Sequence, residues 1–154
     1  MPASPNQIAL SMPRERFAQM KAVSATLGGA NMSATVGALI KLAQMQGLIA
    51  EGIPGCAVKR LPDGVVVEFD GEFRRSHAIP LGAVAPLAET IRGFASGTER
   101  ASELFDLDAL VIVKKQGPSV KITLGGVGGP AKTWTCDLAV EFSDLLDAAL
   151  AKAA

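Results

Sequence analysis

The stretch "NQIALSM", residues 6–12, constrains the fold most, because it reads as a strand that has no partner nearby. Its apolar and small or polar side chains alternate: Ile8, Leu10 and Met12 between Gln7, Ala9 and Ser11. This period of two is typical of a strand with one buried face. A single strand has unpaired N–H and C=O groups along both edges. No second strand pattern occurs in the first 50 residues, so the partner must come from elsewhere.

Two helices follow this strand. Pro13 suits the first position of a helix, and Glu15 in the first turn suits the helix dipole. Gly28-Gly29 is expected to end the first helix, and Asn31 to cap a second helix over roughly residues 32–46. The apolar residues of the second helix are Met32, Val36, Leu39, Ile40, Leu42, Ala43 and Met45. They cover most of its surface, so we expect it to be buried on several sides.

Both features are explained if two chains associate about a two-fold axis. Each strand would then pair antiparallel with its copy, and the second helices would pack together beneath the two strands. The sequence therefore predicts a homodimer formed through the front segment.

Residues 6–50 resemble the ribbon-helix-helix DNA-binding proteins of the Arc and MetJ type. The resemblance lies in "QIALSMPRERF", the Gly28-Gly29 turn and "NMSATVGALI". It implies that the paired strands enter the major groove of double-stranded DNA. The base contacts would come from Gln7, Ala9 and Ser11, and the phosphate contacts from Arg14, Arg16, Asn31, Met32 and Ser33. Ala9 offers only a methyl group where polar or basic residues are usual, which argues against strong sequence specificity.

Two other interpretations of the front segment stay open. An ordinary helix-turn-helix needs a polar, basic recognition helix, whereas residues 32–46 contain only Lys41. A dimerisation module without DNA fits the weak charge, because the formal net charge of the whole chain is zero. Residues 1–55 have a balance of +2 and residues 56–154 a balance of −2, so the small positive excess falls on the proposed DNA-binding module.

After a linker at residues 51–55, the hydrophobic period changes to two. Residues 56–154 are expected to form an α+β domain of two β-β-β-α units, about 56–97 and 107–154, joined by a polar connection at 96–106. The expected strands are "CAVKRL", "GVVVEF" and "EFRRSHAI", then "ALVIVKK", "SVKITL" and "KTWTCDLAV". The expected helices are residues 80–95 and the closing "EFSDLLDAALAKAA".

This layout is similar, more faintly, to the Whirly-type single-stranded DNA-binding folds. A surface for single-stranded DNA needs basic side chains among aromatic ones. The candidates are Arg74, Arg75, Lys114, Lys115, Lys121 and Trp134. The acidic balance of this half argues against the assignment, and a packing or oligomerisation domain is the competing interpretation.

Other sequence patterns argue against a membrane span, a metal site and a nucleotide-binding loop. No apolar run is long enough to cross a bilayer, which predicts no membrane partner, and Cys56 and Cys136 lack metal-ligand spacing, as in a cytoplasmic protein with reduced thiols. "GGVGGPAKT" lacks the Gly-Lys-Ser/Thr step of a nucleotide loop, so we expect a hairpin loop there.

We therefore predict no enzyme, metal site or cofactor, and a cytoplasmic, dimeric DNA-binding protein that regulates transcription. The alternatives are a plasmid or phage DNA-processing accessory protein that also binds single-stranded DNA, and an oligomeric scaffold without DNA binding.

Overall fold

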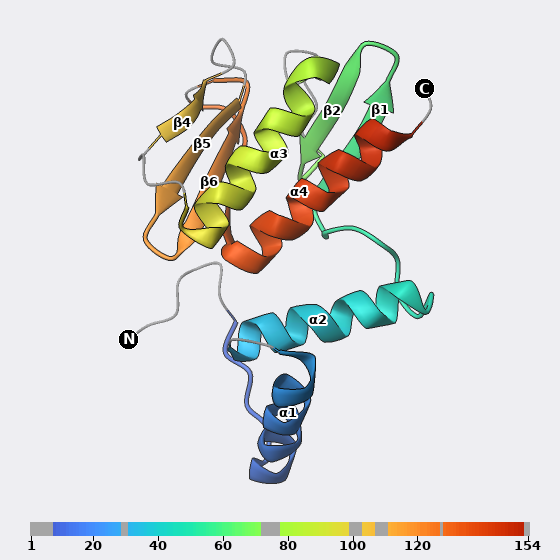
Figure 1. The fold of residues 1–154 in the computed structure, drawn as a ribbon, viewed down its shortest axis with the longest axis vertical. Helices are drawn as coiled ribbons and strands as arrows, with labels where there is room; N and C mark the ends of the chain where they lie inside the picture. Colours follow the sequence, from blue (N-terminus) through green and yellow to red (C-terminus); the bar gives the residue numbers. More distant parts are fainter. Residues whose placement is uncertain are drawn as a thin grey trace. The chain divides into compact units, whose positions relative to one another are not determined.

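The computed structural model describes residues 8–28, 31–71, 78–98, 103–106, 111–126 and 128–152, with the backbone alone for 103–106. The chain divides into two compact units, residues 1–49 and 50–154, which we call the front and back units (Figure 1). Each unit is described separately.

The front unit contains two helices, α1 (Arg14–Leu27) and α2 (Met32–Met45). Pro13 is the N-cap of α1 rather than its first helical residue, and its carbonyl accepts the N–H of Phe17 at 3.0 Å. Gly28 ends α1 in the left-handed conformation with φ 70°, where glycine avoids the strain that a side chain brings. Asn31 caps α2, as the sequence predicts.

Residues 8–13 form no strand in the single chain. The described part of the front unit therefore contains helices only, and the ribbon expected from "QIALSM" is not part of this structure. Since that ribbon needs a second copy of the chain, it stays a prediction.

The back unit is an α+β domain with two antiparallel sheets, which confirms the predicted class. The first sheet has the order β1 (Cys56–Leu61), β2 (Gly64–Phe69), β3 (Ala78–Pro80), and it is followed by α3 (Leu81–Ser96). The second has the order β4 (Glu103–Asp106), β5 (Val111–Gln116), β6 (Ser119–Leu124), β7 (Ala131–Thr135), and it is followed by α4 (Cys136–Ala151).

Two sequence predictions for this unit are wrong. Residues 103–106, expected in a polar connection, form β4, so four strands rather than three precede α4. The stretch "KTWTCDLAV" is extended only to Thr135, and α4 begins at Cys136 instead of Glu141. A helical spacing wins there, because Ala139, Phe142 and Leu146 are all buried at intervals of three and four residues.

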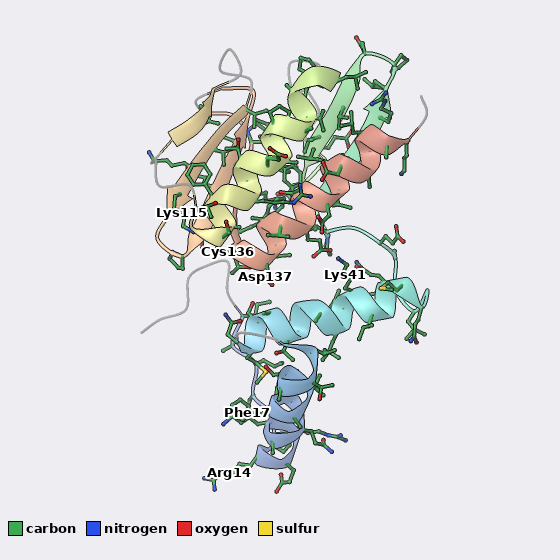
Figure 2. All side chains as sticks on the ribbon, in the orientation of Figure 1. Arg14, Phe17, Lys41, Lys115, Cys136 and Asp137 are labelled. Carbon is green, nitrogen blue, oxygen red and sulfur yellow. The ribbon has the colours of Figure 1, made fainter. Side chains whose placement is uncertain are left out.

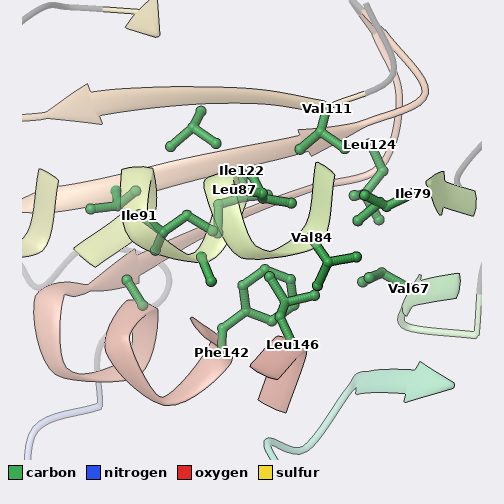
Figure 3. Packing of buried hydrophobic residues seen from close by; sticks show 14 of the residues in the cluster. Val67, Ile79, Val84, Leu87, Ile91, Val111, Ile122, Leu124, Phe142 and Leu146 are labelled. Carbon is green, nitrogen blue, oxygen red and sulfur yellow. The ribbon is translucent and has the colours of Figure 1, made fainter. Parts of the chain in front are cut away.

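Both helices lie across one face of the two sheets, and the core fills the space between the helices and the strands (Figures 1 and 3). The largest fully buried side chains are Phe69, Phe94, Phe142, Ile79, Leu87, Ile91, Ile122, Leu124, Leu146, Val65 and Val67. On the solvent side of the two helices, the Arg92 guanidinium of α3 donates to Asp144 at 2.8 Å and to Asp147 at 2.6 Å on α4. These hydrogen bonds raise the pKa of Arg92 further.

The two sheet-and-helix sets share a constant spacing of 55 residues. It separates the first residues of β1 and β5 (56 and 111), β2 and β6 (64 and 119), and α3 and α4 (81 and 136). Buried side chains recur at the same spacing, as in the pairs Val65 and Val120, Val67 and Ile122, Phe69 and Leu124, Ile79 and Trp134, Leu87 and Phe142, and Ile91 and Leu146.

Candidate nucleic-acid interface

The predicted base-contacting residues lie before α1. Gln7 is outside the described residues, while Ala9 and Ser11 are exposed. Their apolar neighbours are exposed too: Ile8 is 95% and Leu10 is 77% accessible. The alternation of this stretch therefore buries no apolar face against the described residues of the single chain.

Arg14 and Arg16, the predicted phosphate contacts of α1, occupy the first turn of that helix and are exposed. The Arg16 guanidinium donates to the Gln19 side chain at 3.0 Å. One turn further on, the Lys21 ammonium lies 4.9 Å from the centre of the Phe17 ring. Figure 2 shows Arg14 and Phe17 projecting from α1. The front unit carries four basic side chains against one acidic one, Glu15.

The N-terminus of α2 is organised by Asn31. Its side-chain oxygen accepts the N–H of Ala34 at 2.9 Å, and its backbone carbonyl accepts from Thr35 N at 3.1 Å and Thr35 Oγ1 at 3.0 Å. Asn31 therefore holds the first turn in place. The N–H groups of Met32 and Ser33 belong to the same turn, where a helix favours an anion.

Apolar surface dominates the front unit. Among residues 8–28 and 31–49, only Thr35 is buried. The exposed large apolar side chains of α2 and the residues after it are Val36, Ile40, Leu42, Met45, Leu48 and Ile49. Two helices without a buried apolar core are not expected to be stable alone.

In the back unit, Trp134 is a core residue, which corrects its assignment to a single-stranded DNA surface. It is only 8% exposed, and its ring centre lies 5.5 Å from that of Phe69 and 5.2 Å from that of Phe142. The register explains this position: Trp134 lies opposite buried Val120 and therefore shares its inward face.

Lys115 is also turned away from the outer surface. Its ammonium donates to the Phe94 carbonyl at the end of α3, at 3.1 Å, and to Cys136 Sγ at 3.6 Å (Figure 2). Lys115 has the same strand parity as buried Val111 and Val113, so the pattern of "VIVKK" already indicates its inward direction. The sequence pattern does not indicate this capping role or that of Arg60, whose guanidinium donates to the Leu150 carbonyl near the end of α4 at 3.4 Å.

Lys114 and Lys121 are the remaining described candidates, and they face each other across β5 and β6. Their outward-facing neighbours on these two strands and β7 are Ile112, Gln116, Ser119, Thr123, Ala131, Thr133 and Thr135. None of these is aromatic, so base stacking has no support on this face. Arg74 and Arg75 lie outside the described residues.

Other chemistry has little basis in the described residues. They contain no group of three or more His, Cys, Asp or Glu side chains that could hold a metal ion. In the "GGVGGPAKT" stretch, residues 125–130 connect β6 to β7, and the last three residues belong to β7, where Lys132 pairs with Asp70 at 2.6 Å. No single described helix is long and apolar enough to span a membrane, although α1 and α2 meet that criterion together as a pair bent by 75°.

Comparison with known proteins adds no relative: no family model, no curated protein and no solved structure matches this chain.

Proposed function

We propose that residues 6–50 form a ribbon-helix-helix dimer that binds double-stranded DNA, and that the protein regulates transcription. The observation that carries this proposal is the front unit's exposed apolar surface, which leaves Thr35 as its single buried described residue.

A second copy accounts for that surface. Pairing of two copies of residues 7–12 would turn Ile8 and Leu10 towards a shared core, and the two α2 helices would cover Val36 and Ile40 of each other. The hydrophobic effect is then large, because each buried apolar side chain contributes roughly 1.5–3 kcal/mol.

Three sets of polar groups support DNA binding by this module. The ribbon would place Ala9, Ser11 and the predicted contact Gln7 on the outer face, opposite Ile8 and Leu10. Arg14 and Arg16 follow directly in the first turn of α1, and Met32 and Ser33 offer backbone N–H groups to a phosphate. The front unit of each chain has four basic side chains, which predicts a modest salt dependence.

We infer that the back unit consists of two related repeats. The constant spacing of 55 residues and the matching buried positions support this inference. The repeats also hold each other: Lys115 of the second caps α3, and Arg60 of the first, 55 residues earlier, caps α4. Such a unit suits an oligomerisation or partner-binding domain.

Single-stranded DNA binding is no longer a favoured second function, because Trp134 and Lys115 are turned inward. The scaffold without DNA is the alternative that the exposed front unit equally supports, since a dimer interface alone would explain its apolar surface.

The test is a titration of random and selected duplexes at several salt concentrations. Gln7→Ala should cost about 1–3 kcal/mol on the selected site and little on random DNA, since it removes a base contact. Arg14→Ala should weaken binding to every duplex and reduce the salt slope by about one, since it removes a phosphate contact.

Lys59→Ala provides the matched control for charge. Lys59 is an exposed cation of the back unit that pairs with Glu68 at 3.4 Å, so its loss should leave the salt slope unchanged. A wild-type dimer that binds no duplex at low salt would overturn the DNA proposal in favour of the scaffold.

A further inference from the structure

The first sheet of the back unit has one strand fewer than the second. In the second sheet, β4 pairs along β5, whereas in the first sheet β1 is an edge strand within the described residues. The 55-residue spacing that relates β1 to β5 also relates β4 (103–106) to residues 48–51. By this spacing, the residues that correspond to β4 in the first sheet are Leu48-Ile49-Ala50-Glu51.

Side-chain burial marks the same difference. Val113 of β5 is fully buried beside β4, whereas Val58, the same residue type at the matching position of β1, is only partly buried. Val111 and Cys56 differ in the same way. The edge of β5 is covered by β4, and the edge of β1 is not covered by any described strand.

Residues 48–55 have the properties of a strand and its connection. Leu48 and Ile49 are 73% and 47% exposed, so docking would remove apolar surface from water. Residues 52–55, Gly-Ile-Pro-Gly, give a connection as long as residues 107–110 between β4 and β5. Gly52 and Gly55 have φ of 106° and 75°, and Ile53 is anchored in the core.

We propose that residues 48–51 dock antiparallel on the open edge of β1, as a fourth strand from the same chain. The register follows that of β4 on β5, in which Glu103 faces Lys114, Phe105 faces Val113 and Asp106 faces Ile112. Leu48 then faces Lys59, Ala50 faces Val58 and Glu51 faces Ala57. An exposed edge accepts an added strand through main-chain hydrogen bonds, and a four-residue connection makes closure cheap.

No described strand pairs with the outer edge of β1, so this edge is a docking site for a strand that the chain itself carries. This inference rests on the back unit and its connecting segment, and it is independent of DNA binding.

Disulfide trapping in the full-length chain tests the register, with Cys56→Ser and Cys136→Ser as background. Glu51→Cys with Ala57→Cys should oxidise rapidly within one chain, because facing strand residues meet the Cα separation that a disulfide needs. The control pair Glu51→Cys with Leu61→Cys lies four residues out of register and should oxidise at least tenfold more slowly.

Equal oxidation rates for the two pairs would overturn the proposal. A 51–57 disulfide that joins two chains would overturn the same-chain assignment and make the occupant a second copy. Hydrogen exchange provides a check without added cysteines: the β1 amides should be protected in the wild type and exchange faster in Ala50→Pro. Identical exchange in the two proteins would also contradict docking.

Discussion

The two units of this chain differ in where their apolar side chains go. The back unit buries a continuous core of aromatic and aliphatic residues between its sheets and α3 and α4. The front unit leaves its apolar side chains in water, although α2 is as rich in them as the back-unit helices. The difference teaches that apolar composition alone does not produce a core. The back unit has layers that cover each other, whereas the described part of the front unit has no second layer.

The largest expected effect tests the core of the back unit. Phe142 is fully buried, and its ring contacts those of Phe69 and Trp134. Phe142→Ala should lower the free energy of unfolding by about 3–5 kcal/mol, because it removes apolar burial and leaves a cavity. Urea denaturation followed by the fluorescence of Trp134, the only tryptophan, measures it. Val140→Ala, an exposed position on the same helix, should change stability by less than about 0.5 kcal/mol.

If Phe142→Ala also abolishes self-association of the front unit, the two units are not stabilised separately, and the contrast drawn between them is wrong.

The next effect tests the missing layer of the front unit. Leu10 and Ser11 are adjacent and both exposed in the single chain. If the protein stayed a single chain, an aspartate at either position would therefore have the same small effect on stability. In a paired ribbon, Leu10→Asp would bury a charge and should cost several kcal/mol, shifting the dimer to monomer. Ser11→Asp would keep its charge in water and preserve the dimer while weakening DNA binding. Sedimentation equilibrium separates the two variants.

If Leu10→Asp and Ser11→Asp sediment alike, the strand pairing that defines the proposed dimer is refuted.

Local patterns in the sequence predicted most of the elements. The strands at 56–61 and 64–69 follow from a period of two and the Pro62-Asp63 turn, and α2 follows from the Asn31 cap. The start of α4 was misplaced because "TCDLAV" alternates like a strand, and packing against α3 decides in favour of the helix. β4 was missed because its pairing with β5 is a contact between segments that a local pattern does not record.

The candidate site was less predictable. The inward direction of Lys115 and Trp134 depends on strand parity and register. Lys115 shares the parity of buried Val113, and both Lys115 and Trp134 lie opposite buried Val120. The proposed ribbon forms between two chains. The sequence of one chain indicates it only through a strand pattern that has no partner nearby.

A smaller effect tests whether the two repeats of the back unit hold each other. Lys115→Met should destabilise the back unit by about 1–2 kcal/mol, because it removes a charged donor from the carbonyl of Phe94 at the C-terminus of α3. Lys121→Met is the control on the outer face of β6 and should cost less than about 0.5 kcal/mol. Equal losses in urea denaturation would show that Lys115 acts only as a surface charge.

The last expected effect is a pH dependence confined to the back unit. Burial raises the pKa of the Cys56 thiol from 9.0 to about 11, with Lys132 lowering it and Asp70 raising it to smaller extents. The folded chain therefore holds this proton more tightly than the unfolded chain. The resulting stability is fully present below pH 9 and is lost as the pH rises through 11. Between pH 8 and 10.5, the wild type should lose more unfolding free energy than Cys56→Ser, whose hydroxyl does not titrate in this range. Parallel pH profiles for the two proteins would show that Cys56 is solvated, and that the edge of β1 is more open than its partial burial indicates.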